Sequence, residues 1–298
     1  MKISKSYTKR LVLALLLIGL VSCLTSKDGQ ESKAYVLEEG IVYKTVDGID
    51  LKLDIARPGR GRGPFPGLIF ISSGGALELD RRTELSGEIK RAAERGYVAV
   101  TIEYRPIRKP DEKGVQVEYP FPAPLHDAKC AVIWMRSNAE KYRIDPERIG
   151  AIGYRFPGHL ALLLGLTDPD DGLESECEND ELSSRVQAVV NWFGPTEMHS
   201  FYHQSISYVK FWALEPYLGG TQEEFPDNYR LASPVYVSDG DPPILSVMAK
   251  YDSYYGPMDK QGELLDAKMK EAGLSHTLLV VKPPAKLDLL DFFDSHLN

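Results

Sequence analysis

Two histidines, His199 and His203, lie four residues apart near the middle of the chain. On a helix this spacing turns both rings to one side, where two imidazoles could bind a metal ion. No glutamate follows His199 to act as a base and no third ligand is evident, so the pair alone does not make a metal site. The acidic run over residues 168–174 fails as a calcium loop, because Gly172 stands at its fifth place. We therefore predict no metal and no cofactor.

The first 22 residues have the pattern of an export signal. They contain basic residues and no acidic one, and an apolar run over residues 11–21 that is too short to span a bilayer as a stable helix. Residues 20–23 read Leu-Val-Ser-Cys and resemble the lipobox of bacterial lipoproteins. The resemblance implies acylation of Cys23, a tether over residues 23–34 and a lipid-anchored protein of the periplasm or outer membrane. A plain secretory signal with an incidental cysteine is the alternative.

The rest of the chain is acidic. The first 22 residues hold four of the 35 basic residues, so 31 basic residues face 43 acidic ones after their removal, and the net charge falls from −8 to −12. Such a surface repels nucleic-acid phosphates, which excludes a nucleic-acid partner. The length of 298 residues, with 43% hydrophobic and 26% charged residues, is that of an ordinary globular protein.

Two cysteines remain after the signal, Cys130 and Cys177. Cys130 lies in an apolar run with helical character, whereas Cys177 lies in an acidic loop. In an oxidising compartment the two could form a disulfide. Their spacing leaves open the alternative of a buried Cys130 and a free Cys177.

From residue 35 onward the pattern predicts one domain in which short apolar strands alternate with helices. Asp47 and Gly48 mark a hairpin between the first two strands, because both residues accept positive φ at little cost. The expected strands are 40–45, 49–56, 67–72, 97–104, 148–154, 186–193, 243–248 and 277–281, and the expected helices are 78–95, 124–142, 157–166, 257–272 and 287–297. This alternation predicts a mostly parallel sheet of about eight strands, with helices on both faces.

The segment over residues 195–241 has no clear strand and is rich in aromatic residues. We expect it to act as a cap over the carboxyl ends of the strands, where open α/β sheets bind ligands. Its aromatic side chains could either line a groove for a sugar or aryl group or pack inside the cap.

Several segments resemble the α/β-hydrolases, and among them the BD-FAE-like branch of bacterial acetyl and feruloyl esterases. Residues 150–161 read Gly-Ala-Ile-Gly-Tyr-Arg-Phe-Pro-Gly-His-Leu-Ala and resemble the strand, elbow and helix around the nucleophile of that family. The other matching segments are residues 103–106, 121–132, 144–149, 232–235 and 241–245. The resemblance covers about residue 35 to the C-terminus and implies an α/β-hydrolase fold.

The resemblance also implies a chemistry and the positions that should perform it. In the family a serine on the elbow attacks a carbonyl, a histidine on a late loop takes its proton, and an aspartate orients the histidine. Residues 153–157 read Gly-Tyr-Arg-Phe-Pro, so Arg155 stands at the nucleophile position and Phe156 supplies the amide that follows it. A guanidinium stays protonated near neutral pH and cannot attack an acyl carbon.

The base position of the family is occupied by Lys286, whereas Asp252 retains the acid. An ordinary lysine titrates near pH 10.4, which makes it a poor base at neutral pH. The loop that should help to hold the oxyanion keeps glycines at Gly74 and Gly75, after Ser73, but lacks the usual histidine.

We therefore expect an esterase-like protein that does not hydrolyse esters and that binds a ligand or a partner at the former active site. Arg155, Lys286 and Asp252 should share one pocket, and their net positive charge predicts an acidic small molecule or carbohydrate as ligand. One alternative is an active carboxylic-ester hydrolase with displaced catalytic residues, for which Ser72 and Ser73 are candidate nucleophiles. In another alternative the pocket is filled by the Arg155 side chain itself. No protein partner and no oligomeric state follow from the sequence.

Overall fold

The computed structural model describes residues 34–72, 82–110, 116–174, 177–179, 181–253, 255–282 and 286–298. The predicted signal segment and Cys23 lie outside these residues. The described residues belong to one compact unit, Ala34–Asn298. None of its described helices has the length and apolar character needed to cross a bilayer.

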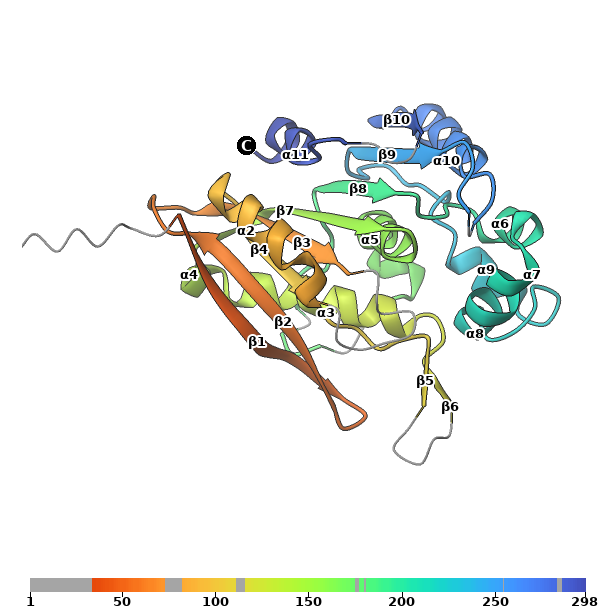
Figure 1. Cartoon of the computed structure of the whole chain (residues 1–298), viewed down its shortest axis with the longest axis horizontal. Helices are drawn as coiled ribbons and strands as arrows, with labels where there is room; N and C mark the ends of the chain where they lie inside the picture. Colours follow the sequence, from red (N-terminus) through yellow and green to blue (C-terminus); the bar gives the residue numbers. More distant parts are fainter. Residues whose placement is uncertain are drawn as a thin grey trace, which may run out of the picture. The chain divides into compact units, whose positions relative to one another are not determined.

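The centre of the unit is an eight-stranded sheet (Figure 1). The strands are β1 (Tyr35–Val46), β2 (Ile49–Pro58), β3 (Phe65–Ile71), β4 (Val98–Ile102), β7 (Ile144–Tyr154), β8 (Ala188–Trp192), β9 (Ile244–Ala249) and β10 (His276–Val281). Their order is β1-β2-β4-β3-β7-β8-β9-β10; β1 and β2 run antiparallel to their neighbours, and all pairs from β4 to β10 are parallel. A separate two-stranded hairpin joins β5 (Arg108–Pro110) to β6 (Gln116–Glu118).

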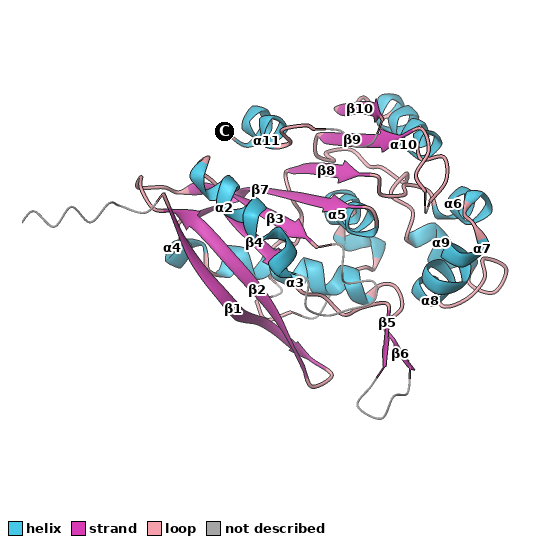
Figure 2. Ribbon diagram, viewed as in Figure 1, coloured by secondary structure: helices cyan, strands magenta, loops and turns pink. Residues whose placement is uncertain are grey.

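Helices cover both faces of the sheet (Figure 2). The helices are α2 (Ser86–Glu94), α3 (Ala123–Ser137), α4 (Ala139–Tyr142), α5 (Phe156–Leu166), α6 (Met198–Gln204), α7 (Ser207–Val209), α8 (Glu215–Leu218), α9 (Pro226–Leu231), α10 (Asp259–Glu271) and α11 (Leu290–Leu297), with short turns at η2 (Arg82–Leu85), η3 (Pro169–Asp171) and η4 (Lys210–Leu214). Apolar residues of α3, α5 and α10 pack on one face, and those of α2 and α11 pack on the other. The mostly parallel sheet between two helical layers confirms the predicted fold class.

The hairpin predicted at Asp47 and Gly48 is confirmed. Both residues have positive φ, 54° and 73°, and they join β1 to β2 where Val46 pairs with Ile49. Asparagine, aspartate and glycine tolerate this conformation better than other residues, which is why the pair could be recognised from the sequence.

The element boundaries differ from the predictions at three helices and two strands. The predicted helix 124–142 is divided at Asn138, whose side-chain amide donates to the carbonyl of Trp134 at 3.0 Å and competes with the helical pattern. Of the predicted helix 78–95, residues 78–81 lie outside the described residues, 82–85 form the turn η2, and α2 begins at Ser86. The predicted helix 287–297 begins at Leu290. The strands β1 and β7 begin earlier than predicted, at Tyr35 and Ile144.

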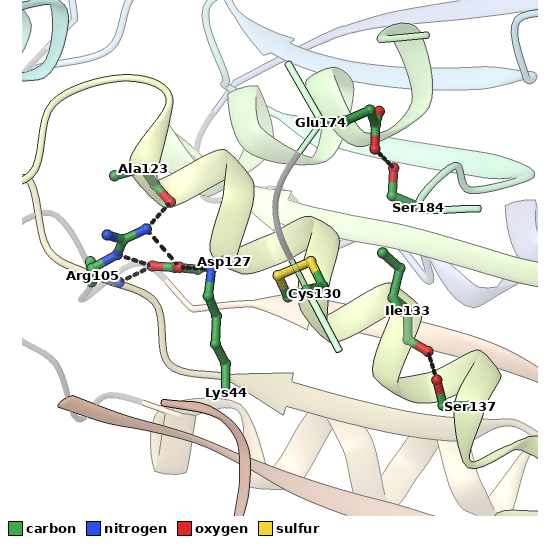
Figure 3. The surroundings of a disulfide bond; sticks show 10 residues. Lys44, Arg105, Ala123, Asp127, Cys130, Ile133, Ser137, Glu174 and Ser184 are labelled. Atoms are coloured by element: carbon green, nitrogen blue, oxygen red, sulfur yellow. Dashed lines mark hydrogen bonds and ion pairs between the residues drawn. A yellow bond between two sulfur atoms is a disulfide. The ribbon is translucent and has the colours of Figure 1, made fainter. Parts of the chain in front are cut away.

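Two of the segments that resemble the esterases are joined by a buried ion pair (Figure 3). Asp127 on α3 is fully buried and accepts hydrogen bonds from Nε and Nη2 of Arg105 at 2.9 and 3.0 Å. Lys44 on β1 donates to the same carboxylate at 2.9 Å. A buried carboxylate with this many donors attaches α3 to both the strand ends and β1.

The parallel strands bring the predicted site residues to one edge of the sheet. Arg155 follows β7 and Asp252 follows β9, and the segment containing Lys286 follows β10. The segment 195–241 contains the helices α6 to α9 and no strand, and it lies beyond the carboxyl ends of β7, β8 and β9 (Figure 1). The fold therefore assembles the site at the position typical of open α/β sheets.

Candidate functional site

The turn between β7 and α5 has the sharp shape of a nucleophile elbow, although its tip is an arginine. Arg155 has φ 64° and ψ −124°, and its amide donates to the carbonyl of Trp192 at 2.7 Å. Positive φ costs a residue with a side chain about 1–2 kcal/mol. A Cβ on Gly153 would lie 2.1 Å from the carbonyl oxygen of Pro157, so only glycine fits there. The backbone thus keeps a strained strand-to-helix turn without a nucleophile on it.

The Arg155 side chain is held by the aspartate at the acid position. Its Nη2 donates to Oδ2 of Asp252 at 2.8 Å. Asp252 is 4% exposed and the Arg155 side chain is 28% exposed. The guanidinium carbon lies 5.4 Å from the ring centre of Tyr154 and 5.8 Å from that of Tyr255, within the range of cation–π attraction. The aspartate that would orient a histidine in a working triad instead binds a guanidinium.

Backbone contacts fix Asp252 in a tight turn after β9. Its amide and carbonyl pair with Gly256 at 2.7 and 2.9 Å, and its Oδ1 accepts a hydrogen bond from the amide of Tyr255 at 3.0 Å. The second oxygen of the carboxylate is the one that binds Arg155. The turn therefore orients the carboxylate toward the elbow.

Tyr255 completes the group, and the sequence reasoning missed it. Burial raises the pKa of its hydroxyl to about 12; the charge of Arg155 and the backbone N–H of Phe156 oppose the shift, and Asp252 adds to it. In an esterase the amide at this position would help to hold an oxyanion. The sequence does offer one signal for Tyr255, because it follows Asp252 by three residues. In turns, an aspartate side chain often accepts a hydrogen bond from a backbone amide shortly after it in the chain.

Lys286 is not brought into contact with Arg155 or Asp252. It is exposed and forms no hydrogen bond or ion pair within the described part of the chain. It lines a cavity of about 680 Å³ together with Tyr154 and Trp192, on the side of the sheet covered by α2 and α11. Among the described residues, the elbow therefore holds one cation and one anion, Arg155 and Asp252, and Lys286 does not add its charge to this pair.

The predicted oxyanion loop at Ser73, Gly74 and Gly75 lies outside the described residues. Ser72, which follows β3, is buried, and its carbonyl accepts a hydrogen bond from the hydroxyl of Tyr104 at 3.1 Å.

A serine, a histidine and an aspartate do form a hydrogen-bonded chain elsewhere, in the order that a catalytic triad requires. Oγ of Ser246 lies 2.9 Å from Nε2 of His276, and Nδ1 of His276 lies 2.9 Å from Oδ1 of Asp266. Burial lowers the pKa of His276, against the opposing effect of Asp266. Ser246 and the His276 side chain are both 0% exposed. A nucleophile must reach its substrate, and Ser246 is buried with His276 between β9, β10 and α10. In the conformation described, these hydrogen-bonded residues are therefore closed to a substrate.

Two further histidines are neutral at physiological pH because of burial. Burial lowers the pKa of His159 to about 3, and its ring nitrogens face the carbonyl of Pro195 and the hydroxyl of Tyr217, each at 3.2 Å. Burial and the charge of Lys44 lower the pKa of His126 to about 4. Neither contacts a serine hydroxyl in the described structure.

The histidine pair of the cap lies on α6, as its spacing suggests. The rings of His199 and His203 are 5.0 Å apart, and Nε2 of His203 lies 2.8 Å from the side-chain amide of Gln222. Within residues 34–298, as far as they are described, no three His, Cys, Asp or Glu side chains are grouped to hold a metal ion.

The aromatic residues of the cap fall into two groups. Tyr217 is buried and packs edge-on against Phe156 on the elbow helix. Tyr208, Phe211 and Trp212 are 57%, 59% and 47% exposed. Packing inside the cap is therefore confirmed for Tyr217, whereas a ligand groove at the three exposed residues stays a prediction.

The two cysteines left open by the sequence form a disulfide (Figure 3). Cys130 on α3 is bonded to Cys177, 47 residues later, in the loop that follows α5. The neighbouring Lys129 is buried and forms an ion pair with Glu174 of the same loop. The loop after α5 is thus attached to α3 by a covalent bond and by a charge pair.

Comparison with known proteins places these features in context. The BD-FAE family model matches residues 53–269. Esterase LipC of Mycobacterium tuberculosis is 27% identical over 190 residues, which are 63% of this chain and 45% of LipC. The non-reducing polyketide synthase ausA of Emericella nidulans is 26% identical over 172 residues, which are 54% of this chain and 6% of the synthase. The chain thus spans less than half the length of these curated relatives.

Solved structures show the same fold. A truncated carbohydrate esterase from gut microbiota has a TM-score of 0.71 at 23% identity and covers 89% of this chain and 97% of its own. A thermophilic esterase of Thermogutta terrifontis has a TM-score of 0.65 at 24% identity and covers 86% of this chain and 84% of its own. Both share the α/β-hydrolase architecture with this protein.

Proposed function

Because the chain belongs to the BD-FAE family of esterase-like α/β-hydrolases, we propose that it is a member that does not hydrolyse esters and that binds an acidic ligand at the former active site. The observation that carries this proposal is the ion pair of Arg155 and Asp252 at the tip of the elbow. A guanidinium supplies no nucleophile, and the paired carboxylate supports no histidine. The ring of Tyr255 lies 5.8 Å from the guanidinium carbon and adds a cation–π contact that holds the arginine in this position.

The first test is hydrolysis of 4-nitrophenyl acetate at neutral pH. We expect the wild-type rate to stay within twofold of a heat-denatured control. Arg155→Ser and the double variant Arg155→Ser/Lys286→His should behave alike, because residue 286 does not contact Asp252 and triad members act as a unit. A rate well above the control that is abolished by a fluorophosphonate inhibitor would contradict the proposal.

An active hydrolase with displaced residues is the second candidate, and the chain of Ser246, His276 and Asp266 is the observation in its favour. Mass spectrometry after treatment with a fluorophosphonate probe distinguishes the two candidates. We expect no adduct on Ser246, because the residue is sealed from solvent. An adduct on Ser246 that is lost in Ser246→Ala would favour the hydrolase instead.

The proposed ligand is an acidic small molecule or carbohydrate. The Arg155 side chain is 28% exposed, and it lies against Tyr154, which is 41% exposed. A guanidinium binds carboxylates through paired hydrogen bonds, and an adjacent aromatic ring offers an apolar face to a sugar.

Calorimetry with glucuronate and glucose tests this ligand class. We expect wild-type protein to bind glucuronate more tightly than glucose, and the preference to weaken with added salt. The charge-neutral double variant Arg155→Met/Asp252→Asn should lose the preference, whereas Arg230→Met, a change at a cap arginine distant in sequence from the elbow, should keep it. Equal binding of both sugars by the wild-type protein would refute the acidic-ligand proposal.

We also propose that the protein is exported and lipid-anchored through Cys23. The basic residues, the apolar run and the lipobox-like segment support this proposal. Cys23→Ala should abolish acylation and remove the mature-size protein from the membrane fraction of an expressing bacterium. Ser22→Ala, which keeps the thiol, is the matched control. A processed Cys23→Ala protein that still sediments with membranes would show that no anchor forms at this residue.

A further inference from the structure

A cavity of about 680 Å³ lies between α2 and α11, over the ends of β3, β7 and β8, and the elbow ion pair does not line it. Its lining residues are Phe70, Ile71, Leu85, Glu88, Arg91, Ile152, Gly153, Tyr154, Trp192, Lys286, Leu287, Asp288, Leu289 and Leu290. The volume is within the usual range of small-molecule sites. The cavity is on the opposite face of the sheet from α5, and Tyr154, whose ring lies against Arg155, borders both the cavity and the elbow.

The two helices that wall the cavity are held in place by charge pairs. Arg91 on α2 lies 2.5 Å from Asp288, and Arg95 lies 2.8 Å from the same residue. Arg95 also pairs with Asp291 and Asp294 on α11. These four contacts join α2 and the residue that follows it to α11 and the loop that precedes it, and such a network constrains geometry better than an isolated surface pair.

Packing against the sheet fixes α11 at a second point. A Cβ on Gly150 would lie 2.5 Å from the ring of Phe293, so this helix rests directly on the backbone of β7. Phe293 is fully buried. With α11 fixed by the charge network and by this contact, the cavity is preformed, and a ligand would not have to order its walls.

The lining is apolar except for four charged residues at its rim. Arg91 pairs with Asp288 and lies 3.6 Å from Glu88, so one cation serves two carboxylates there. Lys286 is the fourth charged residue, and it forms no ion pair in the described part of the chain. The four charges sum to zero, but Lys286 is the one cation among these described lining residues without a carboxylate partner, and it lies beside an apolar chamber.

Trp192 lines the cavity and also carries a polar group without a partner. Its indole Nε1 is buried and has no hydrogen-bond partner within the described residues. Such a group costs free energy unless an acceptor reaches it.

We propose that this cavity binds a monocarboxylate with an apolar body, with the carboxylate at Lys286 and the apolar body against Phe70, Ile152 and Trp192. One unmatched cation fits one carboxylate, and the aromatic and aliphatic lining fits a hydrocarbon chain or ring. Neither Arg155 nor Asp252 lines this cavity, but Tyr154 borders both it and the proposed acidic-sugar site, so variants at the elbow and at Lys286 are needed to distinguish the two.

Octanoate and octan-1-ol, which share a chain but differ in charge, are the probes. By calorimetry on the full protein we expect octanoate to bind at least fivefold more tightly than octan-1-ol. Lys286→Gln should weaken octanoate binding about fivefold to tenfold, the size expected of one partly exposed charge-assisted contact, and leave octan-1-ol unchanged. Lys282→Gln, at an exposed lysine that does not line the cavity, should change neither.

Two more variants separate this site from the elbow and from general misfolding. Leu287→Trp, at a 37% exposed position on the rim, should fill the entrance and weaken both probes. Arg155→Met/Asp252→Asn should bind both probes like the wild-type protein. The proposal is overturned if the wild-type protein binds neither probe, if Lys286→Gln leaves octanoate binding unchanged, or if the elbow double variant loses it.

Discussion

Removing the disulfide with Cys130→Ala/Cys177→Ala is expected to lower the free energy of unfolding by about 4 kcal/mol, the chain-entropy value for closing a loop of this size. The bond joins residues that are 47 positions apart. Without it, the unfolded chain regains the freedom of that loop, and only the pair of Lys129 and Glu174 still connects the loop after α5 to α3. Urea unfolding of the oxidised wild-type protein and the double variant measures the difference.

A second arm uses the wild-type protein with the disulfide reduced. It should unfold at nearly the same urea concentration as the double variant, since both lack the cross-link. If the oxidised and reduced wild-type proteins unfold together, the bond does not stabilise the fold. The size of the effect also bears on the proposed export, because the protein would reach its full stability only in an oxidising compartment.

Replacing the elbow arginine alone with Arg155→Met should destabilise the protein by about 2–3 kcal/mol, less than the 3–5 kcal/mol of a fully buried pair because Arg155 is partly exposed. The change removes the guanidinium from a carboxylate that is only 4% exposed. The double variant Arg155→Met/Asp252→Asn should recover most of the loss, because an uncharged amide can still accept the amide hydrogen of Tyr255.

The measurement is a double-mutant cycle from urea unfolding at pH 7 and low salt, with Asp252→Asn as the fourth corner. A coupling free energy of about 1.5 kcal/mol or more is expected for a pair with this burial. If the four corners are additive within about 0.5 kcal/mol, Arg155 and Asp252 do not stabilise each other, and the ion pair is not what holds the arginine in place at the elbow.

The parts of this structure that could be predicted are those set by local chemistry. The hairpin at Asp47 and Gly48 follows from which residues tolerate positive φ, and the order of strands and helices follows from apolar periodicity. That Arg155 and Asp252 would lie together follows from their positions in the resembling segments, and the cost of burying an unpaired charge accounts for their ion pair.

The position of Lys286 could not be read from the sequence, because it depends on contacts between distant segments. The chain after β10 is directed by where α11 docks, and three aspartates meeting Arg95 determine that docking. Arg95 precedes those aspartates by almost 200 residues. No local pattern carries such information, and the same holds for Ser246 and His276, which meet only through the register of two parallel strands.

The retained elbow has a consequence for how this region tolerates substitution. Its sharp turn depends on glycines where no side chain fits: Gly153 against Pro157, and Gly158 and Gly194 against each other's backbone. The side chain at position 155 takes no part in those contacts. Most amino acids should therefore be accepted there without loss of the turn, at a cost in stability that the double-mutant cycle bounds. A library of substitutions at residue 155 would therefore vary the side chain at the carboxyl edge of the sheet, while the backbone of the turn keeps its conformation.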